Sequence, residues 1–153
     1  MRPAREEDLS RLRVLFRRSI RALAVGHYDP PQIEAWAGAS EDEGWIASEE
    51  LPDLWVAQIG VSLVGFAEIS PEGDEVRMVY VEPTVAERGI GTALLERVEE
   101  EARRRGVDCL SLRSSLNAVP FFEKFGYETR AERERRMDDG TILRIVDMQK
   151  PLG

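Results

Sequence analysis

A glycine turn that opens a helix is the stretch of this sequence best suited to chemistry. An apolar run ends at Val81, and Arg88-Gly89-Ile90-Gly91-Thr92 leads into a segment with helical periodicity. Such a turn presents free backbone N–H groups with the helix dipole behind them, so a phosphate binds there without side-chain charge. Because Gly89 and Gly91 have no Cβ atom, an anion can approach the chain closely. The turn is therefore a candidate phosphate site.

Several interpretations of this turn compete. A P-loop requires Gly-Lys-Ser/Thr before the helix, whereas residues 91–93 are Gly-Thr-Ala. A Rossmann fingerprint requires Gly or Ala at its third position, which Leu94 occupies here. A coenzyme A diphosphate site and a tight turn without a ligand both stay open from the turn alone.

Apolar periodicity and turn residues predict the elements that must position the turn. In the first part of the chain we expect an edge strand at 1–4, a helix at 7–24, a second helix that begins after the N-cap residue Asp29, and a helical turn at Trp45 and Ile46. Strands should follow at 54–59, 63–69 and 76–81, then a helix at 92–105, a strand at 108–113 and a helix at 118–125. The last element should be a hairpin of 127–138 with 141–149, with its turn at Asp139-Gly140. The strand–helix–strand unit makes 76–81 parallel to 108–113, and the other strands can be antiparallel. The fold class is α/β (α+β), a mixed, mostly antiparallel twisted sheet flanked by helices.

Single residues also carry expectations. In the helix at 92–105, Leu94, Leu95, Val98 and Ala102 form the buried stripe, while Glu99 is among the residues expected to face water. Cys109 lies in an apolar strand pattern and is expected to be a small buried residue rather than a nucleophile.

Composition limits the possible functions. The 153 residues suit one domain, 1–153, with no apolar run long enough for a membrane helix and no secretory leader, so we expect a cytoplasmic protein without a membrane partner. One cysteine and one histidine make a poor zinc site, and we expect no metal. The net charge of −8 argues against nucleic acid and mildly favours cationic partners such as amines.

A second motif follows the glycine turn. The stretch Asn117-Ala118-Val119-Pro120-Phe121-Phe122-Glu123-Lys124-Phe125-Gly126-Tyr127, after the turn and its Leu-Leu helix, resembles the GNAT superfamily of N-acetyltransferases. The resemblance covers about residues 54–149, and the two motifs together are specific. The segment 28–36 also looks like a bacterial-type GNAT subgroup whose substrates are mostly unassigned.

The resemblance implies a coenzyme site. Acetyl-CoA would be the co-substrate, bound between a central splayed pair of parallel strands, 76–81 and 108–113. The backbone of Val79, Tyr80 and Val81 would pair with the pantetheine arm and polarise the thioester. The N–H groups of Arg88, Gly89, Ile90, Gly91 and Thr92, with Glu87 nearby, would hold the diphosphate. Asn117 would contact the coenzyme arm, cap the helix at 118–125, or do both.

Two residues depart from the family pattern. Ala86 stands where many relatives have Gln or Arg at the start of the diphosphate motif, which predicts weaker binding. Phe122 stands where many relatives have the tyrosine that protonates the leaving thiolate. Water, Tyr80 or Tyr127 could supply that proton instead, and general acid catalysis is worth about 10²–10⁴-fold.

The implied reaction is direct attack of a primary amine of a small molecule or peptide on the thioester, in a ternary complex. Glu68 interrupts an apolar strand and is the leading candidate for the base, against the ordinary alternative of a solvent-facing residue. His27, Tyr28 and Trp36 are candidates for the acceptor pocket. A coenzyme-binding regulatory module with weak catalysis is the alternative function, and a homodimer is possible because exposed strand edges in this architecture often pair.

Overall fold

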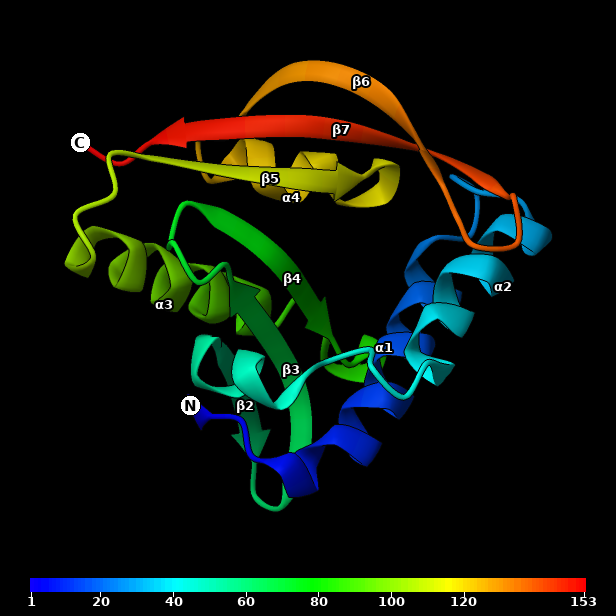
Figure 1. Ribbon diagram of the computed structural model, residues 1–153, viewed down its shortest axis with the longest axis horizontal. Coiled ribbons are helices and arrows are strands. Elements are labelled where there is room, and N and C mark those ends of the chain that lie inside the picture. The colour runs from blue at the N-terminus through cyan, green and yellow to red at the C-terminus, as the bar shows by residue number, and fades with distance from the viewer.

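The structure, a computed structural model that describes residues 1–153, is built on one seven-stranded sheet in the order β1-β2-β3-β4-β5-β7-β6 (Figure 1). The strands are β1 (Arg2–Pro3), β2 (Leu54–Ile59), β3 (Ser62–Ile69), β4 (Glu75–Val81), β5 (Cys109–Ser115), β6 (Glu128–Arg136) and β7 (Ile142–Pro151). β4 and β5 form the parallel pair, and every other neighbouring pair is antiparallel. The predicted mixed sheet is confirmed, including the parallel connection through a helix.

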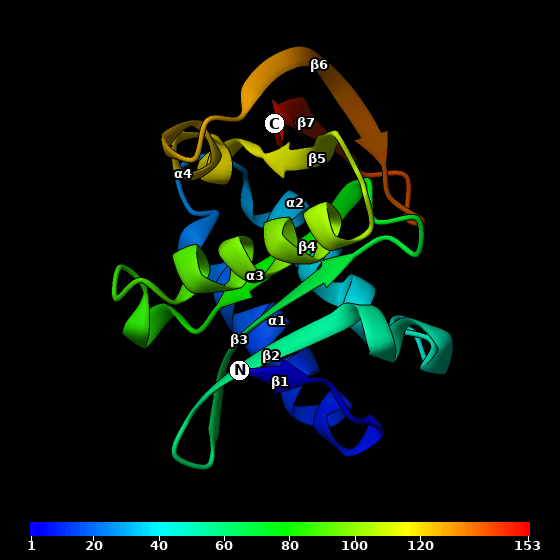
Figure 2. The same ribbon diagram turned by 90° about the vertical axis from the view of Figure 1, so that its left-hand side faces the viewer.

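Helices cover both faces of the sheet. They are α1 (Leu9–Leu23), α2 (Pro30–Ala37), α3 (Ile90–Arg104) and α4 (Val119–Lys124). Figure 2 shows α3 in front of the strands and α1 and α2 behind them. Two apolar cores result: one contains the buried stripe of α3, and the other contains the apolar faces of α1 and α2. The predicted Asp29 cap is confirmed, because Asp29 Oδ1 accepts from the Gln32 N–H at 2.9 Å and Gln32 Oε1 accepts from the Asp29 N–H at 2.9 Å.

The parallel pair separates almost as soon as it forms. β4 and β5 pair only at Glu75 with Ser111 and at Val76 with Leu112. The register between β3 and β4 then shifts at Ile69 and Glu68, which leaves Arg77 as the extra residue of a bulge. Bulges bend a strand and increase its local twist, so the bulge contributes to turning β4 away from β5. The predicted splay is therefore present, and Figure 1 shows the two strands diverging.

Two predictions of local structure are wrong. Trp45 and Ile46 form no helical turn but a bend between two short 3₁₀ segments, Gly38–Glu41 and Ser48–Asp53. Cys109 is exposed, because Leu110 and Leu112 take the buried side of β5 and the alternation of the strand places Cys109 on the other side.

The prediction that Glu99 faces water is also wrong, because the residue is only 4% exposed. Tyr127 Oη donates to Glu99 Oε2 at 2.7 Å, and Lys150 Nζ donates to the two carboxylate oxygens at 2.9 and 3.0 Å. Both partners come from segments far along the chain, so helical periodicity could not reveal them. The buried carboxylate is tolerated because it is paired and hydrogen-bonded.

Candidate active site

A cavity of about 660 Å³ opens at the N-terminus of α3. The first hydrogen bond of the helix joins the Ala93 N–H to Gly89 O at 3.0 Å, and the N–H groups of Ile90, Gly91 and Thr92 have no protein acceptor. No side chain caps this helix, and its first turn contains no acidic residue. The positive end of the helix dipole is thus left for an anion from outside the chain.

The backbone of the turn is shaped for this purpose. Gly89 has φ +83°, a conformation that only glycine adopts without strain, and a Cβ atom there would meet nothing within 4 Å. Glu87 also has a positive φ, 71°, although it is not glycine. A Cβ on Gly91 would lie 3.3 Å from the ring of Phe121, so this glycine also admits close packing of α4 against the turn.

The predicted coenzyme residues are mostly brought together. The cavity is lined by Val79, Tyr80, Val81, Ala86, Glu87, Gly89, Gly91, Thr92, Asn117 and Phe122, with others from α1 and α4. Arg88 and Ile90 are not among its lining residues, although the Ile90 N–H belongs to the free amides of the turn. The side chain of Arg88 therefore does not supply positive charge to the cavity in place of the residue missing at Ala86.

The edge of β4 that faces the splay carries free backbone groups. The Glu82 N–H donates to Val64 O at 2.8 Å, so it points toward β3. Because successive backbone groups of a strand point to opposite sides, Tyr80 also directs its N–H and C=O toward β3, whereas Val79 and Val81 direct theirs toward β5. β5 no longer pairs with β4 at this level. An extended ligand arm could therefore hydrogen-bond to Val79 and Val81.

Asn117 offers a further polar group. Its Oδ1 atom is buried without a hydrogen-bond partner, and the residue lines the cavity. The prediction that Asn117 caps the following helix is wrong, because Ala118 occupies the N-cap position and no side chain caps α4. Buried polar atoms are normally satisfied, so this oxygen is suited to accept from a ligand N–H.

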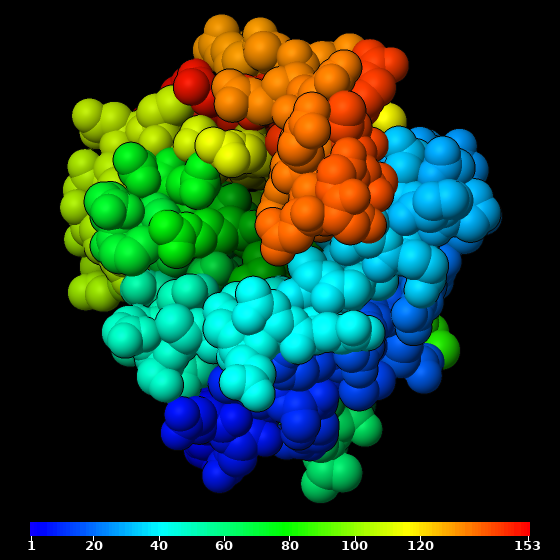
Figure 3. Space-filling model, turned by 45° about the vertical axis from the view of Figure 1, so that its right-hand side comes forward, coloured from blue at the N-terminus to red at the C-terminus, as the bar shows by residue number.

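A second cavity, of about 280 Å³, lies on the other side of the splay. Figure 3 shows this face hollowed between the orange β6 and the green strands. The two cavities share six lining residues, Trp36, Val79, Tyr80, Ser115, Ala118 and Phe122. The gap between β4 and β5 is thus the place where a ligand in one cavity can touch a ligand in the other. We call this place the junction.

Tyr80 is the proton-bearing aromatic residue of the junction. Its ring packs against Phe16, with centroids 4.7 Å apart, and against Phe66 at 5.5 Å. Burial raises the pKa of Tyr80 to about 12, and the side chain of Trp36 opposes this rise. Tyr80 therefore keeps its proton at neutral pH. Phe122 lies at the junction without a proton to give.

Tyr127 lines neither cavity. Its hydroxyl donates to Glu99, and burial together with that carboxylate raises the pKa of Tyr127 far above its usual range. Of the two tyrosines that could replace the missing acid, only Tyr80 has access to the junction.

Glu68 is 2% exposed and lines neither cavity. Burial raises the pKa of Glu68 to about 9, and the neighbouring Glu50 raises it further while Arg77 opposes the rise. At neutral pH the carboxyl group is therefore protonated and cannot accept a proton. This position gives no geometric support to its predicted role as the base.

The three residues proposed for the acceptor pocket divide between the cavities. Tyr28 lines the smaller cavity, where its hydroxyl accepts from the Leu116 N–H at 3.0 Å and donates to Arg144 O at 2.6 Å. Trp36 lines both cavities, whereas His27 lines only the larger one. The histidine is thus on the coenzyme side rather than on the side where we expected it.

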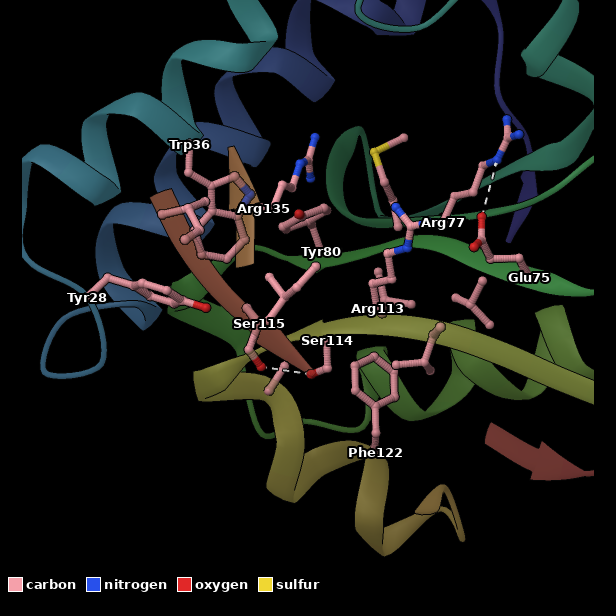
Figure 4. A pocket seen from close by; sticks show the side chains of 17 residues that line it. Tyr28, Trp36, Glu75, Arg77, Tyr80, Arg113, Ser114, Ser115, Phe122 and Arg135 are labelled. Carbon is pink, nitrogen blue, oxygen red and sulfur yellow. Dashed lines mark hydrogen bonds and ion pairs between the residues drawn. The ribbon is translucent and has the colours of Figure 1, made fainter. Parts of the chain in front are cut away.

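Sequence reasoning missed several residues of the smaller cavity, chiefly Glu75, Arg77, Ser114, Arg113 and Arg135 (Figure 4). Arg77 could have been found, because it interrupts an otherwise apolar strand. Arg113 and Arg135 come from β5 and β6, and only the strand order β5-β7-β6 places them around one opening. No group of three or more His, Cys, Asp or Glu side chains is arranged to hold a metal ion.

A splayed parallel pair beside an uncapped helix N-terminus, with cavities on both sides of the splay, defines an acyltransferase that uses an acyl-coenzyme A. A sequence model of the family described as an acetyltransferase (GNAT) domain matches residues 24–152. The chain belongs to the GNAT family of acetyltransferases, and it is an acetyl-CoA-dependent acyltransferase.

Individual relatives agree. The uncharacterized N-acetyltransferase YafP of Escherichia coli K12 is 34% identical over 122 residues, which are 80% of this chain and 76% of that protein. A crystal structure of a GCN5-related N-acetyltransferase from Rhodopseudomonas palustris superposes with a TM-score of 0.91 at 33% identity, covering 98% of this chain and 93% of that one. The PaiA N-acetyltransferase of Thermoplasma acidophilum, solved with coenzyme A, shares the fold, with a TM-score of 0.69, 22% identity and coverage of 98% and 96%. None of the helices of the present chain combines the length and the apolar character that crossing a membrane requires.

Proposed function

We propose that this chain, as one domain over residues 1–153, transfers the acetyl group of acetyl-CoA to a primary amine by direct attack in a ternary complex. The observation that carries the proposal is the junction, where a coenzyme-sized cavity and a smaller cavity share six lining residues. Two substrates that enter from opposite sides would meet there without a covalent enzyme intermediate.

The residues of the larger cavity fit acetyl-CoA. The free N–H groups of Ile90, Gly91 and Thr92 suit its diphosphate, and the backbone of Val79 and Val81 together with Asn117 Oδ1 suits its amide-bearing arm. The coenzyme supplies an activated acyl group on a thiol that leaves readily. The Val79 N–H, which faces the splay, is the group of this chain best placed to polarise the acyl carbonyl.

The transfer itself forms a C–N bond and breaks the C–S bond. The amine loses one proton, and the departing sulfur takes one up. Glu75 is the one carboxylate that lines the smaller cavity, but it precedes Val79 by four residues, or about 13 Å of strand. The amine proton would therefore leave through water. Tyr80, which keeps its proton, would donate a hydrogen bond to the departing sulfur, and the sulfur would take its proton from water.

Calorimetric titration with acetyl-CoA, on the wild type and on a pair of variants at Thr92, tests the proposal. Thr92 is the third residue of α3, where glutamate favours a helix because it neutralises the free N–H groups. Thr92→Glu should therefore keep or raise the melting temperature while it weakens acetyl-CoA binding at least tenfold by repelling the diphosphate. Thr92→Gln, similar in size but neutral, is the matched control and should weaken binding much less.

Two results would reject the coenzyme site. One is the absence of both heat and thermal shift when the wild type meets millimolar acetyl-CoA. The other is equal affinity of the wild type and Thr92→Glu, which would place the diphosphate away from the turn.

A further inference from the structure

Three arginines converge on the smaller cavity. Arg77 comes from β4, Arg113 from β5 and Arg135 from β6, and Figure 4 shows their side chains around the same opening. Glu75 is the only carboxylate among the lining residues. This local excess of positive charge occurs in a chain whose net charge is −8. The composition had favoured cationic partners, but the cavity has the opposite electrostatic preference.

The guanidinium groups of this cavity are poorly neutralised by the protein. Arg77 Nε lies 3.8 Å from Glu75 Oε1, near the limit for an ion pair, and the side chains of Arg113 and Arg135 form no ion pair or hydrogen bond. Asp147 is the strand partner of Arg113, but its carboxylate is bound by Arg133 at 2.5 Å. All three arginines are exposed, so water screens their mutual repulsion, and an anionic ligand in the cavity would gain favourable contacts with all of them.

The arginines lie at a short distance from the junction. Arg77 precedes Val79 by two residues and Arg113 precedes Ser115 by two residues, which corresponds to about 7 Å of strand in each case. Arg135 is close enough to Tyr80 for its charge to act on that hydroxyl. A small molecule whose amine reaches the junction would thus hold a second group, a few bonds away, among the arginines.

We propose that the acetyl acceptor is a small primary amine that also carries a carboxylate or phosphate group, with the amine at the junction and the anionic group at Arg77, Arg113 and Arg135. This inference rests on the proposed function and names its substrate class. Guanidinium groups bind carboxylates and phosphates alike through paired hydrogen bonds, so the cavity alone does not select between the two. The volume of about 280 Å³ suits a small molecule.

The first test is a panel of acceptors assayed by release of the coenzyme A thiol. It contains ω-amino acids of two to five carbons, the matching carboxamides, aminoalkyl phosphates of similar length, plain alkylamines and a polyamine. We expect kcat/KM for the best carboxylate or phosphate acceptor to exceed that for its uncharged counterpart at least tenfold, and salt to reduce the difference. The carboxylate and phosphate arms identify which anion is preferred.

The second test asks whether the arginines cause the preference. Arg113→Gln and Arg135→Gln should each lower the ratio of kcat/KM between the anionic acceptor and its uncharged counterpart about fivefold to tenfold. Arg136→Gln is the matched control, because Arg136 is an exposed neighbour on the same strand, lines neither cavity and forms no ion pair. It should leave the ratio unchanged.

The outcomes separate the inference from the proposed function. A preference for uncharged amines or polyamines would overturn the inference. The same holds for a ratio of kcat/KM values that is equal in the wild type and in both variants. Neither result would contradict the proposed acetyltransferase activity. If no acceptor in the panel is acetylated, calorimetry of the same compounds on the coenzyme A complex decides, and no binding of any anionic amine overturns the inference. Failure to bind acetyl-CoA at all would instead reject the proposed function.

Discussion

Replacing Glu68 by glutamine should stabilise the protein, and the gain should grow as the pH rises. Glu68 is buried on β3, and its Oε2 atom has no hydrogen-bond partner. Burial and Glu50 raise the pKa of Glu68 from the ordinary 4.5 to about 9. Glutamine has nearly the same shape, keeps a donor for Glu50 and never has to be charged.

The sign and size follow from proton linkage. Between pH 4.5 and 9 the folded protein holds a proton on Glu68 that the unfolded chain has released. The contribution of Glu68 to stability is therefore fully present below pH 4.5 and is lost as the pH rises toward 9, by about 1.4 kcal/mol per unit of pH. At pH 7 the free energy of unfolding of the wild type is therefore about 3 kcal/mol lower than at pH 4.5 because of Glu68, and Glu68→Gln should not show this decrease.

Urea denaturation at pH 5.5, 7.0 and 8.5, with the wild type, Glu68→Gln and the exposed control Glu134→Gln, measures this effect. The difference in unfolding free energy between Glu68→Gln and the wild type should increase across the three values, since other titrating groups are common to both proteins. Glu134→Gln should follow the wild type. A constant difference would refute the assignment of a protonated, buried carboxyl. Loss of acetylation in a well-folded Glu68→Gln would restore Glu68 as a candidate base.

Three further changes have defined outcomes. Gly89 and Gly140 have φ +83° and +88°, and a Cβ atom added to either would meet nothing within 4 Å. Gly89→Ala and Gly140→Ala should therefore each lose about 1 kcal/mol of stability through backbone strain alone. Only Gly89→Ala should weaken acetyl-CoA binding in calorimetry, and equal binding by both variants would contradict the role of the turn. Glu99→Gln leaves Lys150 without its buried carboxylate and should cost about 3 kcal/mol in urea denaturation, whereas the exposed Glu96→Gln should cost little. Phe122→Tyr adds a hydroxyl at the junction and should raise kcat several-fold in the thiol-release assay if proton donation to sulfur limits turnover; an unchanged kcat would indicate that Tyr80 is sufficient.

The sequence by itself determined the order of the elements and identified most of the residues that it proposed for the coenzyme and that now line the larger cavity. The reason is that these features are local. Each of these features lies within one short continuous segment of chain, where periodicity and turn chemistry can be recognised. Examples are the Asp29 cap, the apolar stripe of α3 and the strand that leads into Gly89.

Only the tertiary structure decided which charged residues line the smaller cavity. Arg113 and Arg135 line the same cavity because β6 folds back beside β7, which pairs with β5. Glu68 and Glu99 were misjudged for the same reason, since burial and the pairing of Glu99 with Lys150 depend on distant segments. Strand alternation tells which side a residue faces but not what lies opposite it, and the pKa of a carboxyl group depends on what lies opposite.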